Sequence, residues 1–261
     1  MRIARYTTGQ DPTYGIVSEE DDGRAVLAEV QGDPLYQPIT YTGVQVPLDD
    51  VRLLAPVIPR SKVIGIGKNY ADHVLEMGGS EAPAEPLMFL KPNTSVVGPG
   101  DPIVLPRQSA NVHYEGELAV VIGRICKDVP RERVGEVVFG YTCANDVTAR
   151  DLQSSDGQWA RAKGFDTFCP LGPWIETALD PADLALTTRL DRRAVQDSRT
   201  SNLVHDVATI VAYVSAAFTL LPGDVILTGT PSGVGRLDAG QRVEVEIEGI
   251  GTLANPVVSR D

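Results

Sequence analysis

Two glutamates stand at the start of an unbroken apolar run near the middle of the chain. Glu115 and Glu117 lead into residues 118–122, Leu-Ala-Val-Val-Ile, which predict a buried strand. Because side chains alternate along a strand, both glutamates point to one face and Leu118 points to the other. Burying an ionised carboxylate without a partner is very costly, so the fold must place compensating groups at the start of this strand.

That compensation is either a proton or a cation. Two carboxylates about 4 Å apart repel each other by about 4 kcal/mol at an effective dielectric constant of roughly 20, so one of them takes a proton or a cation lies between them. A third carboxylate, Asp146, ends another apolar stretch and favours the cation. Ligands that are all oxygen atoms favour Mg²⁺ or Mn²⁺ over Zn²⁺. We therefore predict that Glu115, Glu117 and Asp146 bind a metal ion.

The same spacing of glutamates recurs near the C-terminus, where it has a simpler interpretation. Residues 243–248 alternate strictly between apolar residues and Glu244, Glu246 and Glu248. Such alternation is typical of a strand that has one face in solvent. We predict a solvated face here, and the same interpretation competes with the metal site at Glu115 and Glu117.

Charge and composition exclude several classes of partner. The chain has 261 residues and a formal net charge of −12, which argues against nucleic acid and anionic membrane surfaces as partners. No stretch approaches the roughly 20 apolar residues of a membrane span, and the N-terminus lacks the apolar core of a signal peptide. The three cysteines, Cys126, Cys143 and Cys169, are odd in number and scattered, as expected in a reduced compartment. We expect a soluble cytoplasmic protein.

Short strand patterns predict a β-rich chain in two parts. Strand candidates at 3–6, 14–17 and 25–30, separated by Asp and Gly turns, predict a small N-terminal β domain over residues 1–58. A second domain, 59–261, follows the linker at Pro56 and Pro59. Its strand candidates lie at 62–67, 117–122, 137–145, 171–176, 185–190, 225–228 and 242–248. Since no regular alternation of strands and helices is present, we predict a β-rich roll with a few helices.

Two helices are predicted. Apolar residues from Leu203 to Phe218 recur at helical spacing, with Ser201 or Asn202 as the N-cap and Pro222-Gly223 as the end. A shorter helix is predicted at residues 69–78. The long helix is interpreted as core packing, and His205 on it as structural.

The short helix carries a candidate catalytic pair. His73 and Glu76 are three residues apart, so that they can contact each other, and a carboxylate that orients a histidine is typical of a general base. Many such pairs are incidental, which is the competing interpretation. His113 is a rival histidine because it shares the strand face of Glu115 and Glu117 and is a possible ligand.

Further polar side chains cluster in sequence after Asp146. If a helix starts after Asp146, Arg150 and Gln153 share one of its faces, where a guanidinium suits a carboxylate and an amide suits a keto or hydroxyl oxygen. Lys163 stands among small residues, and near carboxylates it would keep its charge and stabilise an enolate. The loop at 228–235, which includes Thr230, supplies hydroxyls and backbone N–H groups for an anion. Solvated surface positions are the competing interpretation.

Taken together, these motifs resemble those of the fumarylacetoacetate hydrolase family. The matching segments follow the family's order and are 67–73 (GKNYADH), 89–92 (FLKP), 114–118 (YEGEL), 145–153 (NDVTARDLQ), 163–167 (KGFDT) and 227–235 (LTGTPSGVG). The resemblance covers residues 62 to about 250, and the N-terminal part looks like the small extra domain of some bacterial members. Residues 77–86, in the region of the family's lid, differ widely among members and leave the substrate open.

The resemblance implies a fold, a cofactor and roles for single residues. It implies a β-sandwich roll, usually a homodimer, in which Mg²⁺ or Mn²⁺ is bound by Glu115, Glu117 and Asp146. It also implies that Lys163 is the active-site lysine, that His73 and Glu76 form a catalytic pair on a mobile lid, and that His113 is not a ligand. The positions implied to contact substrate are Arg150, Gln153 and Thr230.

Three reactions of small 2-oxo acids share one intermediate at such a site. A metal that binds the carboxylate and keto oxygens of the acid polarises its carbonyl and stabilises an enolate. Hydrolytic C–C cleavage of an acylpyruvate such as fumarylpyruvate is favoured, because His73 and Glu76 supply a base for water. The alternatives are isomerisation of 2-hydroxyhepta-2,4-diene-1,7-dioate, decarboxylation of oxaloacetate, and binding of metal or oxo acid without turnover.

Overall fold

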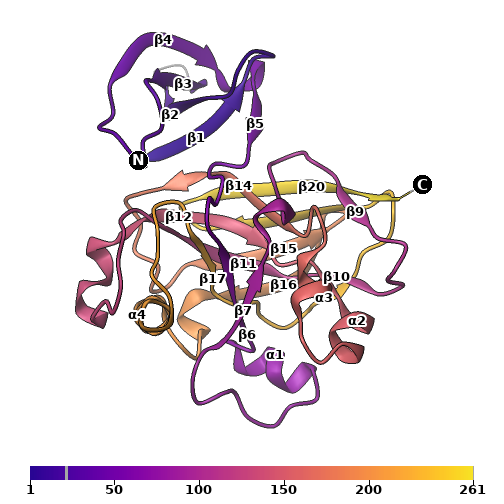
Figure 1. Cartoon of the computed structure of the whole chain (residues 1–261). Helices are drawn as coiled ribbons and strands as arrows, with labels where there is room; N and C mark the ends of the chain where they lie inside the picture. The colour runs from indigo at the N-terminus through magenta and orange to yellow at the C-terminus, as the bar shows by residue number, and fades with distance from the viewer. Residues whose placement is uncertain (21–22, 261) are drawn as a thin grey trace.

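Strands dominate the computed structural model, which describes residues 1–20 and 23–260 (Figure 1). The strands are β1 (Arg2–Thr7), β2 (Thr13–Glu19), β3 (Ala25–Val30), β4 (Tyr41–Pro47), β5 (Arg52–Leu54), β6 (Val63–Gly67), β7 (Leu87–Lys91), β8 (Val96–Val97), β9 (Ile103–Leu105), β10 (Val112–Tyr114), β11 (Gly116–Ile122), β12 (Val138–Asn145), β13 (Thr148–Ala149), β14 (Cys169–Glu176), β15 (Ala185–Leu190), β16 (Arg193–Arg199), β17 (Val225–Leu227), β18 (Gly235–Arg236), β19 (Arg242–Ile247) and β20 (Gly251–Ser259). The helices are α1 (Ala71–Glu76), α2 (Arg150–Ser155), α3 (Ala160–Gly164) and α4 (Val207–Ala217), with 3-10 turns η1 (Leu48–Asp50), η2 (Asn93–Ser95), η3 (Arg131–Glu136) and η4 (Thr200–Asn202).

The strands form one long sheet and two smaller ones. The long sheet has the order β4-β3-β2-β1-β14-β12-β11-β17-β6-β7, with β5 and β8 paired to β1 and β14. The second sheet has the order β16-β15-β19-β20-β9, and β13-β10-β18 form the third. The predicted fold class, a β-rich roll with a few helices and a small N-terminal β unit, is confirmed. No helix in the described ranges has the length and apolar character to span a bilayer.

The N-terminal unit is continuous with the rest through backbone pairing. Strand β1 pairs antiparallel with β14, where Ile3 lies opposite Ile175. It also pairs antiparallel with β2 and β5 of the N-terminal unit. In Figure 1 the strands β1–β5 lie together at one end of the molecule, above β14. The proposed domain boundary after residue 58 stays a prediction.

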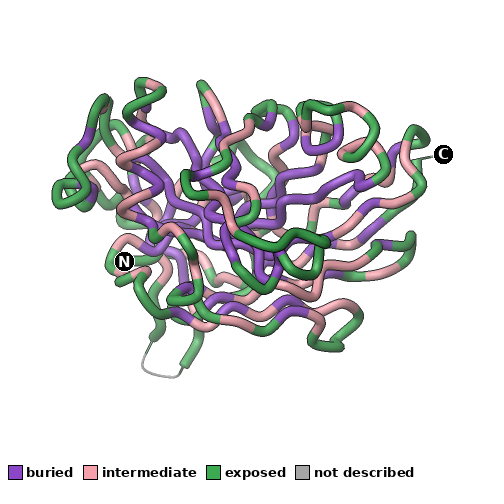
Figure 2. Tube along the Cα trace, turned by 90° about the horizontal axis from the view of Figure 1, so that it is seen from below, coloured by how far each residue is buried: buried purple, intermediate pink, exposed green. Residues whose placement is uncertain are grey.

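Strand β11 is buried on both faces. Leu118 and Val120 belong to an apolar cluster with Leu186 of the second sheet, while Ala119 and Val121 belong to a second cluster on the other face. Figure 2 shows the buried backbone running through the middle of the molecule, with exposed loops around it. Each large apolar side chain buried here contributes about 1.5–3 kcal/mol, which explains why the run at 118–122 has no polar residue.

The long helix α4 is shorter than predicted at its N-terminus. Ser201 and Asn202 lie in η4, and the N-cap is Asp206, whose carboxylate accepts a hydrogen bond of 2.9 Å from the Thr209 N–H. The prediction of Ser201 or Asn202 as the N-cap is therefore wrong. The reason is that the chain just before the helix makes other bonds, because the Val204 N–H donates to the Asn69 carbonyl over 2.9 Å.

The other end of α4 and the position of His205 also differ from the prediction. Helix α4 ends at Ala217, and Phe218 is extended with φ −122° and ψ 143°. His205 precedes the helix instead of lying on it. Its N–H donates to Asn69 Oδ1 over 2.8 Å, and its Nε2 lies 2.9 Å from the Pro83 carbonyl oxygen, so that it has a structural role as predicted.

Candidate metal centre

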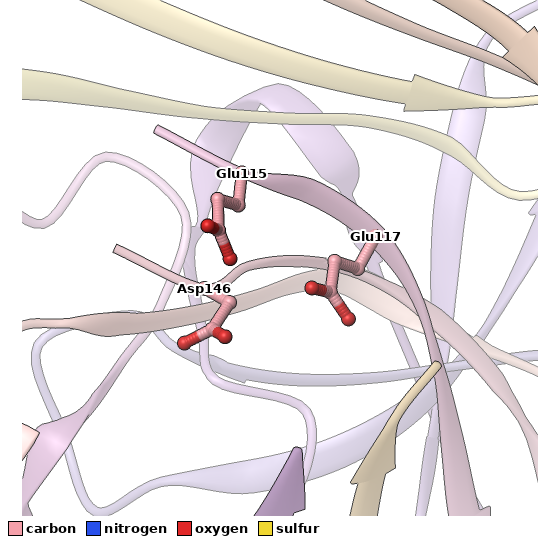
Figure 3. Close-up of side chains that lie close together, drawn as sticks. All are labelled: Glu115, Glu117 and Asp146. Atoms are coloured by element: carbon pink, nitrogen blue, oxygen red, sulfur yellow. The ribbon is translucent and has the colours of Figure 1, made fainter. Parts of the chain in front are cut away.

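Three carboxylates converge where β11 and β12 lie side by side. Glu115 directly precedes β11, Glu117 lies in it, and Asp146 directly follows β12; the two strands pair antiparallel with Glu117 opposite Ala144. The Asp146 N–H donates to the Glu115 carbonyl over 2.8 Å, and Asn145 Oδ1 accepts from the Glu115 N–H over 2.9 Å. One oxygen of each carboxylate lies within 4.8 Å of the others (Figure 3). The structure thus brings the three predicted ligands together.

Buried cations compensate two of these carboxylates. Lys163 Nζ donates to Glu115 Oε2 over 2.7 Å and to Asp146 Oδ2 over 2.6 Å. Lys91 Nζ donates to Asp146 Oδ1 over 2.5 Å, and Arg150 forms an ion pair with Glu115. All of these side chains are buried. Lys163 therefore supplies positive charge between Glu115 and Asp146.

Glu117 has a different environment from the other two. Its Oε2 accepts a hydrogen bond of 2.6 Å from the Gly229 N–H, and no ion pair to it is formed within residues 1–20 and 23–260. Burial raises the pKa of the Glu117 carboxyl well above its usual range, and the charges of Asp146 and Glu115 raise it further. Burial also acts to raise the pKa of Glu115, but Arg150 and Lys163 hold that pKa well below its usual range.

The donor set fits a hard divalent cation. All the candidate ligand atoms are carboxylate oxygens, and the buried Glu117 forms no ion pair with a lysine or arginine of the described residues. A divalent ion here would favour the ionised form of Glu117, which burial otherwise opposes. Oxygen ligands suit Mg²⁺ and Mn²⁺. The assignment of Glu115, Glu117 and Asp146 as ligands, and of the metal, stays a prediction.

Helix α1 carries the predicted catalytic pair beside the carboxylates. His73 Nδ1 lies 3.0 Å from Glu76 Oε2, and the His73 side chain is 7% exposed. Glu76 is held in turn, because its Oε1 accepts from the Gly233 N–H over 2.9 Å. Since Nδ1 faces Glu76, the nitrogen that remains for a reactant is Nε2. Such an arrangement can remove a proton from water, which is the role predicted from the sequence.

One pocket of about 230 Å³ joins nearly all the predicted residues. The predicted residues that line it are His73, Glu115, Glu117, Asp146, Arg150, Gln153, Lys163 and Thr230. Arg150 Nη1 donates to Gln153 Oε1 over 2.9 Å, as their shared helix face predicts. The Thr230 hydroxyl donates to the Gly116 carbonyl over 2.9 Å and accepts from Gln196 Nε2 over 2.8 Å, so it also fixes the loop.

His113 lies apart from this pocket. It belongs to β10, and its Nε2 is 2.9 Å from Asn111 Oδ1. Burial and the nearby Arg150 charge lower the pKa of its imidazole to about 4, which keeps the ring neutral. The rival interpretation of His113 as a ligand is not supported by this position.

Sequence reasoning missed two residues that shape the site. Lys91 is 2% exposed and pairs with Asp146, which is 55 positions away in the chain. Lys91 ends the apolar stretch 87–90 and lies in the matching segment 89–92, but no role is predicted for it. Trp159 lines the pocket and contacts Phe89 edge to face, with ring centroids 5.5 Å apart. No spacing rule connects an isolated tryptophan to a site.

Comparison with known proteins gives matches over nearly the whole chain. Residues 62–258 match the family model described as fumarylacetoacetate (FAA) hydrolase, C-terminal, and residues 1–56 match the Rv2993c-like N-terminal model. A crystal structure of 5-carboxymethyl-2-hydroxymuconate delta-isomerase from Mycobacterium smegmatis has 52% sequence identity and a TM-score of 0.92, with 100% of both chains covered. Oxaloacetate tautomerase Fahd2a, mitochondrial, from Rattus norvegicus is 44% identical over 82% of this chain and 71% of its own length.

A third similar protein was solved with a metal. The crystal structure of maleylpyruvate hydrolase from Sphingobium sp. SYK-6 in complex with manganese(II) ion and pyruvate has 33% sequence identity and a TM-score of 0.81, with 100% of both chains covered. The similar proteins thus include a hydrolase, an isomerase and a tautomerase.

Proposed function

The chain belongs to the fumarylacetoacetate hydrolase family, and from this premise we propose that it is a metal-dependent enzyme that hydrolyses a C–C bond of an acylpyruvate such as fumarylpyruvate. Members of this family are enzymes, among them hydrolases and isomerases. The observation that carries the hydrolytic proposal is the His73–Glu76 contact of 3.0 Å beside the buried carboxylates. Hydrolysis needs such a base to activate water, whereas decarboxylation needs none.

Glu115, Glu117 and Asp146 hold the metal in this proposal, and the cofactor is Mg²⁺ or Mn²⁺. When bound, the metal polarises the carbonyl of a 2-oxo acid. The similar maleylpyruvate hydrolase, which contains manganese(II) and pyruvate, supports this choice of cofactor and substrate class.

Lys163 provides a fixed positive charge for the enolate that departs. Burial acts to lower the pKa of its ammonium group, but the charges of Asp146 and Glu115 outweigh burial and raise that pKa above its ordinary value. The lysine therefore stays protonated, and a preorganised cation in a buried site stabilises negative charge more than it does in water. Arg150 and Gln153 line the same pocket and orient the oxo acid.

His73 activates the attacking water. Its Nε2 takes a proton from water while Glu76 holds Nδ1, and the water oxygen bonds to the acyl carbonyl carbon of the substrate. The bond between that carbon and the adjacent methylene carbon then breaks. Its electron pair stays on the pyruvate part as the enolate, which takes up a proton to give pyruvate, and the other product is the carboxylic acid.

A proton-transfer reaction is the second candidate. A protein with 52% identity over the whole chain is described as a delta-isomerase, and one with 44% identity as an oxaloacetate tautomerase. Isomerisation needs the enolate-stabilising part of the site but no water. In that case His73 moves a proton between carbon atoms.

Parallel assays of an acylpyruvate and oxaloacetate test the proposal, with Mg²⁺ or Mn²⁺ and with a chelator. Metal-dependent release of pyruvate and the acid is the expected result. The variant His73→Ala should lower this rate by about 10²- to 10⁴-fold and leave Mn²⁺ affinity unchanged in calorimetry. Hydrolysis that survives in His73→Ala contradicts the base assignment. Turnover of oxaloacetate alone indicates a decarboxylase or tautomerase. If neither compound is turned over, the isomerase and a binding protein without turnover are the hypotheses that remain.

A further inference from the structure

Lys68 is a pocket-lining cation that no carboxylate of the described chain neutralises. The other lysine and the arginine of the pocket, Lys163 and Arg150, both form ion pairs with Glu115. Lys68 lines the same pocket and is exposed, and it forms no ion pair or side-chain hydrogen bond with residues 1–20 and 23–260. Its ammonium group is thus available to an anion that enters the pocket.

The backbone holds Lys68 in an unfavourable conformation at this place. Its φ is 59°, in the left-handed region that glycine and asparagine adopt more readily than lysine. The next residue fixes this turn, because Asn69 Nδ2 donates to the carbonyls of Thr228 over 2.8 Å and His205 over 2.9 Å. A residue kept in a strained conformation beside a pocket is a candidate for function.

The charges of the pocket favour a substrate with two negative charges. The three carboxylates Glu115, Glu117 and Asp146 are matched in number by three buried cations, Lys91, Arg150 and Lys163, which form ion pairs with Glu115 and Asp146 but not with Glu117. A divalent ion on the carboxylates would therefore leave positive charge for a substrate to neutralise, and Lys68 adds to it. Ile66, Met77 and Trp159 also line the pocket, so an apolar carbon chain can lie between two charged ends.

We propose that Lys68 binds a second carboxylate of the substrate and makes the enzyme selective for 2-oxo acids that carry one. The inference rests on the proposed function, since it assigns the first carboxylate and the keto group to the metal end of the pocket. Lys68 is then a specificity-determining residue that acts on binding, not on the bond that breaks.

Two substrates that differ in the second carboxylate test this role. Fumarylpyruvate has a carboxylate at its far end, and acetylpyruvate has a methyl group there. The variant Lys68→Asn removes the charge and places at this position a residue that tolerates a positive φ, so its melting temperature should be unchanged or higher. We expect KM for fumarylpyruvate to rise about 10- to 100-fold at nearly constant kcat, while KM for acetylpyruvate stays the same. Lys68→Arg, the matched control, should keep the preference.

The outcomes separate this inference from the proposed function. An equal rise in KM for both substrates, or no rise for fumarylpyruvate, overturns the role of Lys68. If the wild-type protein turns over neither compound, the proposed hydrolysis fails, and calorimetry of both compounds on the Mn²⁺-loaded protein decides the inference. Weaker binding of fumarylpyruvate alone in Lys68→Asn supports it, and binding that does not differ between the two compounds overturns it.

Discussion

Glu115 and Glu117 at β11 have the same spacing as Glu244 and Glu246 on β19. The first two are buried, whereas the other two are partly exposed to solvent. The Glu115 side chain is 4% exposed, whereas that of Glu246 is 46% exposed. Both pairs obey the alternation of a strand, so spacing alone puts each pair on one face. The residues C-terminal to each pair distinguish the two, because an apolar run continues after Glu117 and strict alternation continues after Glu244.

The partners of the two pairs differ in the same way. Glu244 and Glu246 form ion pairs with Arg242 and Arg189 at the surface, where such pairs contribute about 0–1 kcal/mol. The cations at the β11 site are buried, and removal of one partner of a buried pair costs about 3–5 kcal/mol. Two sites with the same number of ion pairs can therefore differ greatly in the free energy that those pairs contribute to stability. The predicted solvated face at 243–248 is confirmed by the alternating burial of β19.

The largest effect is expected for Lys163→Met. This change leaves Glu115 and Asp146 without the cation between them, so the free energy of unfolding should fall by about 3–5 kcal/mol when a chelator is present. Urea titration of the purified variant measures it. Mn²⁺ should restore part of the loss, because a bound cation replaces the missing charge. The matched change Arg189→Met should cost less than about 1 kcal/mol with or without Mn²⁺, and an equal cost at both sites contradicts the comparison.

Glu117→Gln should weaken Mn²⁺ binding by about 100-fold, since even groups that only orient metal ligands contribute about 10- to 100-fold. The change keeps the shape of the side chain and removes its charge. Calorimetric titration of Mn²⁺ into wild type and variant gives the two dissociation constants. Glu246→Gln is the control at the other pair and should bind Mn²⁺ as wild type does. If Glu117→Gln binds Mn²⁺ with the same affinity as wild type, Glu117 is not a metal ligand.

Asp206 offers an exposed carboxylate whose contribution to stability depends on pH. Burial acts to raise the pKa of its carboxyl, but hydrogen bonds from Thr209 and the charge of Arg131 lower it below its ordinary value. Because the folded pKa is the lower one, this stabilisation is present above the unfolded pKa of about 3.9 and is lost as pH falls through the folded pKa. Asp206→Ala should cost about 1 kcal/mol at pH 7.

The measurement for Asp206 is urea unfolding at neutral pH and below pH 4. The difference in free energy of unfolding between wild type and Asp206→Ala should be smaller at the lower pH. Asp206→Asn, which caps a helix without titrating, should keep a constant difference from Asp206→Ala over the same range. If the difference in free energy of unfolding between wild type and Asp206→Ala does not depend on pH, the charge of Asp206 does not contribute to the cap.

The smallest effect is expected at the surface pair itself. Glu246→Gln should change the free energy of unfolding by less than about 0.5 kcal/mol, because the pair with Arg189 is exposed and screened by salt. Urea unfolding at low and high salt measures it, and the difference should vanish at high salt. A change of several kcal/mol shows that this pair is also structurally important.

Much of the architecture could be predicted from local pattern. The apolar run at 118–122 and the alternation at 243–248 predicted β11 and β19. The convergence of Asp146 with Glu115 was predicted because one carboxylate precedes an apolar stretch and the other follows one. These predictions succeed because strand periodicity and the cost of buried charge act within a few residues of each position.

The features that sequence pattern missed depend on contacts between distant segments. No strand is predicted between residues 68 and 116, yet β7 pairs with β6 from Lys91 opposite Val63 to Leu87 opposite Gly67. That pairing buries Lys91 against Asp146, and no local rule predicts it. Similarly, α4 begins later than expected because Asn69, far away in the chain, bonds the backbone at Val204.

The pairing of β1 with β14 has a consequence for a truncated chain that lacks the N-terminal unit. Arg2 and Ile3 lie opposite Glu176 and Ile175, and β1 joins β2–β5 to the remaining strands of the long sheet. A chain cut between residues 56 and 62 would leave this end of β14 as an open edge with unpaired N–H and C=O groups. Open edges recruit strands from other molecules, so we expect the isolated C-terminal part to self-associate even where its active site is intact.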